Sequence, residues 1–524
     1  NSHEYHSDDG HGLSEDPIVQ DEIGAYYSGT TGGSVTNGTV REGEIGIFNA
    51  GSGTVSIANN GVITMEKGST TGIKITGSGT VTGGTVELSS NAGGVGVDYQ
   101  NAGGNVTNMT INVNGTGQSG INAGAAIGND KLDKVTINLK NDSSTGINST
   151  AAVDSKAKIL SVTTHKTGII GIKSSADVTN RGIISLNSKG SVTGINSGAA
   201  ASNYGSITIS GYGSNNVGIN GATSANNYNT GRVNVAGTDH AAGVLSAGTT
   251  SNAGIINVSG THSAGLLSTG AASNSGTITV TGDYSDGINS TTNKGSSSLG
   301  DITVKGKRVN GIRGHTDAEL TGGSVIVTSS GNNIVNSRNN GVYAVTGNAS
   351  VSNATVTMNS GEYNNGVYAP VGNVSVTSSS TINLNSNSHS NGVYAPTGNT
   401  TVDGTSGHVR INVGESGKES NNSNGINLVN SNASAANSVK YTTIDMAGNN
   451  NIGVRVQEPG ALTFQNNNMN MSGSENYGLY LAPGKSIPNI SGNSTSSSGS
   501  SNVGIFISED AKITTISGGS HTVN

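Results

Sequence analysis

The amino-acid sequence predicts an all-β protein, folded as a single-stranded parallel β-helix of about 19–20 coils. Three observations lead to this fold class. A short phrase recurs at a near-constant interval, the apolar residues within each repeat alternate with polar ones, and large side chains are almost absent. Together these properties describe a narrow solenoid, in which each coil buries its apolar residues against a copy of itself.

The repeat is plainest in three near-copies, NNGVYAVTGN (339–348), NNGVYAPVGN (364–373) and SNGVYAPTGN (390–399). Its core, a glycine followed by Ile, Val or Leu, recurs periodically in 19 copies, and 16 of the 18 intervals between them lie between 22 and 28 residues. A disordered Gly/Ser-rich chain, which composition alone suggests, has no reason to keep such spacing. The repeat glycines are Gly46, Gly72, Gly96, Gly120, Gly146, Gly171, Gly194, Gly218, Gly243, Gly265, Gly287, Gly311, Gly341, Gly366, Gly392, Gly425, Gly453, Gly478 and Gly504.

Each repeat contains at least two candidate strands. After the repeat glycine, an aliphatic residue and a mostly small or apolar residue flank a polar or aromatic one, which is the alternation of a strand with one buried face. A second phrase, such as SNSGTITVTG (273–282), predicts Ile278 and Val280 inward and Thr277 and Thr279 outward. No helical periodicity separates the strands, which disfavours leucine-rich and ankyrin-like solenoids. Asn and Gly between strands are expected in turns, because they tolerate left-handed backbone angles.

Composition removes several classes of protein and partner. The 524 residues include 82 Gly, three Phe, no Trp and no Cys, and the net charge is −7. Without a block of Lys or Arg, nucleic acid and acidic membranes are poor partners. No run of 18 apolar residues predicts a membrane-spanning helix. The absence of cysteine removes disulfides and thiol chemistry.

The chain divides into two expected parts. Residues 1–30, rich in His and acidic residues at first, form a tail and cap region that leads into the first coil at Ile18–Tyr27, and residues 31–524 form the β-helix. The two longest repeat intervals predict loops at 329–340 and 414–424. Because an uncapped solenoid end exposes strand edges, we expect the natural protein to continue beyond Asn524.

The position two residues after each repeat glycine is expected to face outward, with neighbouring rungs roughly 4.8 Å apart. In this column Tyr343, Tyr368 and Tyr394 form a ladder, and Leu245 and Leu267 pair. Aromatic and apolar residues on an outer face mark a contact surface, and we predict these five as ligand-binding residues. Cross-strand packing is the alternative role, and a ladder can serve both.

No catalytic residue, cofactor or metal site is predicted. The N-terminal cluster of His and acidic residues fits a solvated tail better than a metal site, and four further histidines lack repeated acid or Ser partners. A polysaccharide-degrading β-helix enzyme, the alternative, needs clustered carboxylates, and the nearest approach is Asp283, Asp286 and Asp301 in turn-like sequence. We expect no enzymatic activity. The histidines and acids concerned are His3, Glu4, His6, Asp8, Asp9 and His11 in the cluster and His165, His240, His262 and His315 beyond it.

The phrases S-N-x-G-x-I-x-V and N-x-G-I-x-S, recurring for about 490 residues without cysteine, resemble the passenger domains of type V autotransporter adhesins of Gram-negative bacteria. The resemblance implies a right-handed β-helix on the bacterial surface, with an outer-membrane barrel C-terminal to this chain. It implies binding to a host cell-surface protein or glycan, to another bacterial cell, or to itself. The chymotrypsin-like domain and G-D-S-G motif of the protease passengers are absent, as is an RGD triplet. A structural stalk, with its binding region outside this chain, is a further alternative.

Overall fold

The computed structural model describes residues 22–66, 71–91, 94–161, 166–329, 334–430, 432 and 434–523. It is all-β, with parallel strands stacked as a β-solenoid of about 19 turns, which confirms the predicted fold class. No helix in these ranges is long and apolar enough to cross a bilayer. The described chain divides into two compact units, the first ending at Val258 and the second beginning at Ser259.

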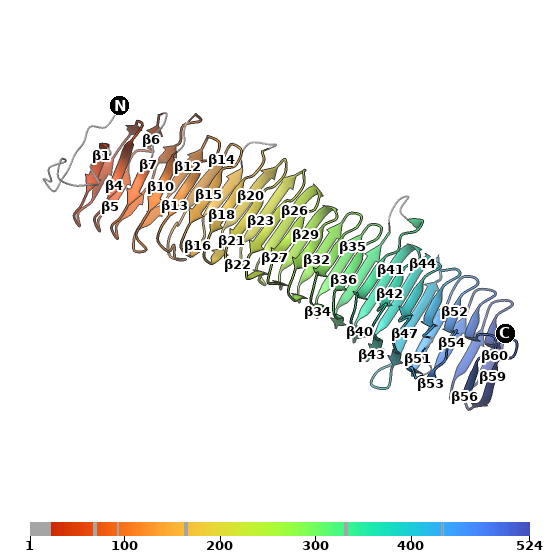
Figure 1. Ribbon diagram of the computed structural model, residues 1–524. Helices are drawn as coiled ribbons and strands as arrows, with labels where there is room; N and C mark the ends of the chain where they lie inside the picture. The colour runs from red at the N-terminus through yellow and green to blue at the C-terminus, as the bar shows by residue number, and fades with distance from the viewer. Residues whose placement is uncertain are drawn as a thin grey trace. The chain divides into compact units, whose positions relative to one another are not determined.

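The strands that carry the repeat glycines form one parallel sheet in each unit, called here the glycine sheet (Figure 1). In the first unit its strands are β1 (Glu22–Tyr27), β4 (Glu44–Asn49), β7 (Thr71–Ile75), β10 (Val95–Tyr99), β13 (Ser119–Ala123), β15 (Thr145–Ser149), β18 (Ile170–Ser174), β21 (Thr193–Ser197), β24 (Val217–Gly221) and β27 (Ala242–Ser246). In the second unit they are β30 (Ala264–Ser268), β33 (Asp286–Ser290), β36 (Asn310–Gly314), β39 (Asn340–Ala344), β42 (Asn365–Tyr368), β45 (Asn391–Tyr394), β49 (Asn424–Leu428), β52 (Ile452–Val456), β55 (Tyr477–Leu481) and β58 (Val503–Ile507).

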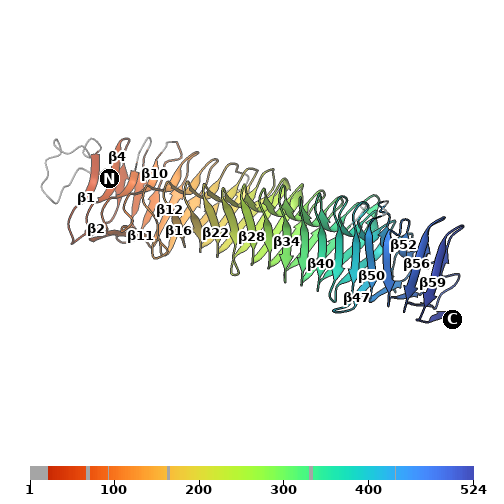
Figure 2. The ribbon, with the colours of Figure 1, turned by 60° about the horizontal axis from the view of Figure 1, so that its bottom comes forward.

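Each turn also contributes to two further parallel sheets. The second sheet contains β22 (Ala200–Asn203) and β25 (Ser224–Asn227) in the first unit and β40 (Ala349–Ser352) in the second, and Figure 2 turns these strands toward the viewer. The third sheet contains β23 (Ser206–Gly211) in the first unit and β32 (Thr277–Thr281) in the second. In β32, Ile278 and Val280 are buried while Thr277 is exposed, as the alternation predicts.

The core consists of aliphatic columns. Eighteen of the nineteen residues that follow a repeat glycine are buried, and the last, Ile505, is half-buried. Register stacks like on like, for example Ile121 opposite Ile147 and Ile147 opposite Ile172. Burial of one such side chain contributes roughly 1.5–3 kcal/mol. Small β-branched residues fill this narrow interior, which explains a chain almost without Phe and Trp.

The repeat glycine is required by lack of space. A Cβ on Gly366 would lie 2.6 Å from the carbonyl oxygen of Gly392 and 2.9 Å from Ile382 Cγ2. The paired residues on either side of it are Asn365 with Asn391 and Val367 with Val393. Gly366 and Val367 are both buried, whereas Asn365 and Tyr368 are both half-buried on the outer face. The glycine therefore places two outward side chains three positions apart.

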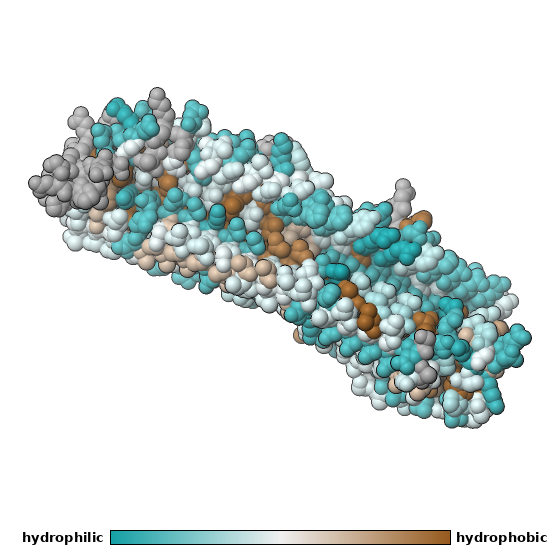
Figure 3. All heavy atoms as spheres, viewed as in Figure 1, coloured by the Kyte–Doolittle hydropathy of each residue, from teal (hydrophilic) through white to brown (hydrophobic). Residues whose placement is uncertain are grey.

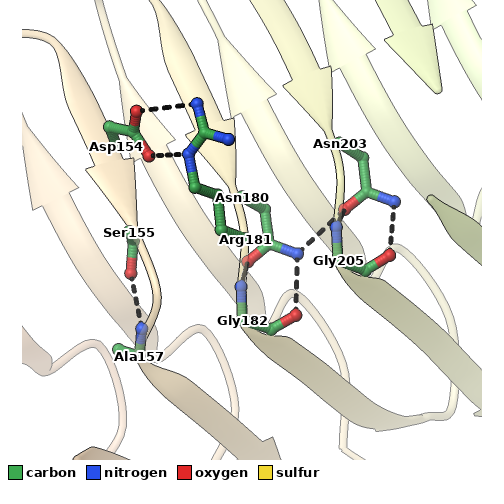
Figure 4. A network of polar contacts seen from close by, with 8 residues as sticks. All are labelled: Asp154, Ser155, Ala157, Asn180, Arg181, Gly182, Asn203 and Gly205. Atoms are coloured by element: carbon green, nitrogen blue, oxygen red, sulfur yellow. Dashed lines mark hydrogen bonds and ion pairs between the residues drawn. The ribbon is translucent and has the colours of Figure 1, made fainter. Parts of the chain in front are cut away.

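A buried amide ladder closes the corner after the second sheet (Figure 4). Asn180 Nδ2 donates to Asn203 Oδ1 at 2.9 Å, and Asn203 Nδ2 donates to Asn227 Oδ1 at 2.9 Å. Asn203 also accepts from the backbone N–H of Gly205 at 3.2 Å and donates to its carbonyl at 3.0 Å. None of these asparagines has positive φ. These asparagines therefore act through their side-chain amides, whereas Asn108, Asn215 and Asn422 have the left-handed backbone that was expected of Asn in turns.

The predicted loop at 414–424 contains a hairpin. Strand β47 (Val409–Glu415) pairs antiparallel with β48 (Lys418–Glu419), with Gly414 opposite Glu419. It borders a hollow of about 420 Å³ that is lined by Glu415, Asp445 and several Asn and Ser residues. The other predicted loop, 329–340, contains residues outside the described ranges, and its exposed part includes Val335.

Candidate functional site

The predicted tyrosine ladder lies on the outer face of the glycine sheet in the second unit. Tyr343 is opposite Tyr368, and Tyr368 is opposite Tyr394. Their ring centroids are 5.4 and 5.6 Å apart, with interplanar angles of 19° and 7°. All three side chains are half-buried, so one edge of each ring faces solvent.

The hydroxyl groups of this ladder differ from that of the buried Tyr99. In the described part of the chain, the hydroxyls of Tyr343, Tyr368 and Tyr394 make no hydrogen bond. The buried Tyr99 behaves differently, because its hydroxyl donates to Gly104 O at 2.8 Å, and burial raises its pKa to about 12. Burial, and then the two neighbouring hydroxyls, raise the pKa of Tyr368. Its hydroxyl stays protonated near neutral pH and can donate to a ligand.

A second ladder, which the sequence reasoning missed, runs beside the tyrosines. Asn340 donates to Asn310 at 2.9 Å, Asn365 to Asn340 at 3.1 Å, and Asn391 to Asn365 at 3.1 Å. Asn424 extends this outer amide ladder by donating to Asn391 at 3.0 Å. The signal was present in the sequence as the Asn before each of these repeat glycines. The two ladders together form a face of aromatic edges, hydroxyls and amides.

Charged groups stand at one end of both ladders. The Arg313 guanidinium lies 5.9 Å from the Tyr343 ring centroid and donates to Asn289 Oδ1 at 3.1 Å. Asp286 occupies the position of the outer amide ladder one rung before Asn310, which donates to it at 2.7 Å. Burial raises the pKa of Asp286 to about 6, against the opposing effects of Asn310 and Arg313.

We expect Asp286→Asn to stabilise the protein above pH 6 by about 2–3 kcal/mol, since one pKa unit corresponds to about 1.4 kcal/mol. The folded-state pKa is above the ordinary value of 3.8, so the carboxyl group destabilises the fold when it is charged. The advantage of the variant should therefore shrink as the pH falls through 6 and vanish near 4. Denaturant unfolding between pH 4 and 7.5 measures this. A variant no more stable than the natural chain at pH 7.5 contradicts it, and the exposed Asp301→Asn is the control.

The predicted leucine pair, Leu245 and Leu267, spans the two units, so its pairing stays a prediction. Leu245 lies in β27 opposite Asn220, and Leu267 lies in β30 opposite Asn289. Both are half-buried, and they belong to different units. The outward column also has a buried exception, Phe48, which is 1% exposed. The Tyr26 ring packs on it edge-on at 5.0 Å, so an outward-facing position is not always an accessible one.

The three candidate carboxylates each have a different hydrogen-bond partner. Asp286 lies in the glycine sheet, whereas Asp301 begins β35 (Asp301–Lys305) in the third sheet and accepts from Ser324 at 2.8 Å. Asp283 accepts from the backbone N–H of Lys307. Over the described ranges, no group of three or more His, Asp or Glu side chains is placed to hold a metal ion. The N-terminal cluster from His3 to His11, and also His165, lie outside those ranges.

One face of the molecule is mostly polar. Figure 3 shows small, separated hydrophobic groups on a face that is mostly hydrophilic or neutral. Comparison of the chain with family models, curated proteins and solved structures finds no match. The chain is therefore a β-solenoid whose glycine sheet carries an outer surface of tyrosine rings and asparagine amides.

Proposed function

We propose that the chain is an adhesin passenger of a bacterial cell surface, which binds its ligand through the face formed by the tyrosine ladder and the outer amide ladder. The observation that carries the proposal is the row of three stacked tyrosines whose hydroxyls make no hydrogen bond to any residue that the structure describes. A purely structural tyrosine would gain from a hydrogen bond, as Tyr99 does. Stacking holds the rings in place before binding, so little side-chain entropy is lost when a ligand arrives.

The chemistry of the face favours a ligand rich in hydroxyl groups. Aromatic edges and half-buried amides provide both apolar contact and paired donors and acceptors in a regular row. A glycan on a host cell or another bacterium fits this pattern, and a cell-surface protein is the other candidate. The resemblance to autotransporter passengers supports display at the outer membrane, with the barrel C-terminal to this chain.

The test removes the ladder. Tyr343→Ser, Tyr368→Ser and Tyr394→Ser combined should lower adhesion to cells or immobilised glycans by at least about tenfold, because aromatic anchors at binding surfaces commonly contribute more than 1 kcal/mol each. The matched control is the same triple change at Tyr204, Tyr212 and Tyr228 in the first unit. Circular dichroism must show that both variants are folded. A folded ladder variant that adheres as well as the natural chain removes this face from the function.

A second candidate is a polysaccharide-degrading enzyme, which the hollow beside the β47–β48 hairpin favours. Two carboxylates line it, Glu415 and Asp445, and glycoside hydrolysis uses two. Incubation with a panel of polysaccharides should release reducing or unsaturated ends if this activity exists. No release, together with adhesion that depends on the tyrosine ladder, favours the adhesin. A structural stalk would show neither.

A further inference from the structure

One corner of the second unit carries a row of large polar side chains that no repeat phrase marks. The row precedes the glycine-sheet strands, and backbone hydrogen bonds fix its register. Tyr284 N donates to Lys307 O at 2.9 Å, and Arg338 N donates to Glu362 O at 3.0 Å. In each case the acceptor directly precedes the row's member on the next turn, which is Arg308 for Tyr284 and Tyr363 for Arg338. The members of this corner column are His262, Tyr284, Arg308, Arg338, Tyr363 and His389.

Every member of the corner column has a left-handed backbone. The φ angles are 50° for His262, 58° for Tyr284, 53° for Arg308, 48° for Arg338, 58° for Tyr363 and 50° for His389. A non-glycine residue in this region is strained by roughly 1 kcal/mol or more, and Asn or Gly is preferred there. Six strained rungs in succession need a reason other than backbone geometry.

Other rungs show that small residues serve this corner well. In the second unit, the equivalent positions after His389 are Asn422 and Asn450, with φ of 51° and 60°, followed by Glu475 and Ser501 with φ of 60° and 58°. In the first unit the same backbone pattern uses Gly117, Ser143, Gly168, Ser191 and Asn215, and then His240 with φ of 51°. Aromatic, histidine and arginine side chains therefore gather in this corner between residues 240 and 389, and both arginines lie within that range. This points to a role for the side chains themselves.

The side chains of the column are exposed and ordered against one another. The His262 and Tyr284 rings stack at 4.9 Å with an angle of 6°, and those of Tyr363 and His389 lie 5.5 Å apart at 30°. The Arg338 guanidinium lies 5.0 Å from the Tyr363 ring centroid. Within the described ranges, neither Arg308 nor Arg338 is in an ion pair. Two guanidinium groups on adjacent rungs thus face solvent between pairs of stacked rings.

We propose that the corner column binds an acidic polysaccharide along its length. Guanidinium groups recognise carboxylate and sulfate groups through paired hydrogen bonds. The flanking tyrosine and histidine rings supply flat apolar edges and donors for the sugar units. The rungs repeat at roughly 4.8 Å, which suits a linear polymer of sugar rings. The whole chain carries a net charge of −7, so its overall charge does not attract a polyanion. The attraction must come from the two arginines of the corner column.

This inference rests on the proposed adhesive function, since it names one class of ligand, but it uses different residues. The corner column precedes each strand, whereas the tyrosine ladder lies on the strand itself. Loss of binding after a change at the corner, with the tyrosine ladder intact, would separate the two surfaces. Loss of cell adhesion in the tyrosine variant alone would support the proposed function without the corner.

The experiment replaces both arginines, Arg308→Asn and Arg338→Asn, in the whole chain. Asn suits the left-handed backbone, so the variant should be folded with an unchanged or higher melting temperature. Binding to immobilised hyaluronan, which carries carboxylates only, or to heparin, which is also sulfated, should weaken about fivefold to tenfold. The two probes decide which anionic group is preferred.

The matched control removes two exposed basic residues that lie outside the corner column, Lys189→Asn and Lys512→Asn. It should bind both probes as the natural chain does. Equal binding by the natural chain and the Arg308/Arg338 variant overturns the proposal. An equal loss in the control variant also overturns it, because the attraction would then be non-specific. Binding of neutral dextran or single-stranded DNA as tightly as the acidic polysaccharides overturns the ligand class.

Discussion

Replacing Asn203 with Asp is expected to destabilise the first unit by about 4 kcal/mol near neutral pH. The change places a carboxylate in the middle of the buried amide ladder, at a position that is 0% exposed. Its second oxygen would face Asn227 Oδ1 at 2.9 Å and the Gly205 carbonyl at 3.0 Å, in place of the N–H groups that now donate to them. Breaking a buried polar network in this way typically costs about 3–5 kcal/mol.

The effect of Asn203→Asp should depend on pH. Burial favours the neutral acid, so the variant should recover part of its stability as the pH is lowered and the carboxyl group is protonated. Hydrogen exchange of peptides covering residues 178–255 measures the change where it occurs. Asn148→Asp, at an exposed outer position of β15, is the control and should change little. Equal protection in Asn203→Asp and the natural chain would show that the ladder is not essential.

Gly366→Ala is expected to destabilise the second unit by about 3 kcal/mol. The added methyl group would lie 2.6 Å from the Gly392 carbonyl oxygen, which belongs to a packed sheet and cannot move independently. The neighbouring rungs must separate locally, so the stacking of Tyr368 on Tyr394 should weaken as well. Tyrosine fluorescence and denaturant unfolding report both effects.

The control for Gly366→Ala is Gly29→Ala. Gly29 is exposed, has no positive φ, and an added Cβ there would meet no atom within 4 Å. It should leave stability within about 0.5 kcal/mol of the natural chain. If the Gly366→Ala and Gly29→Ala variants are equally stable, the close contact between each repeat glycine and the carbonyl oxygen of the next strand is not required for folding.

The ladder of Tyr343, Tyr368 and Tyr394 could be predicted from the sequence, because repeats of similar length place equivalent residues opposite one another in neighbouring strands. The outer amide ladder was equally readable, since Asn precedes the same glycines. The corner column was not readable. Its members share a backbone conformation and not a residue type, and the rung length between Arg308 and Arg338 differs from that between their neighbours.

The sequence by itself determined the period, the strands and the aliphatic core of this protein, because these depend on local alternation repeated along one axis. Only the tertiary structure decided which outward positions are accessible. Phe48 is covered by Tyr26, Asp286 is buried within an amide row, and Asn203 is turned inward to bond its neighbours. Accessibility depends on what the adjacent rungs place over a side chain, and that is a property of packing between residues about 25 positions apart.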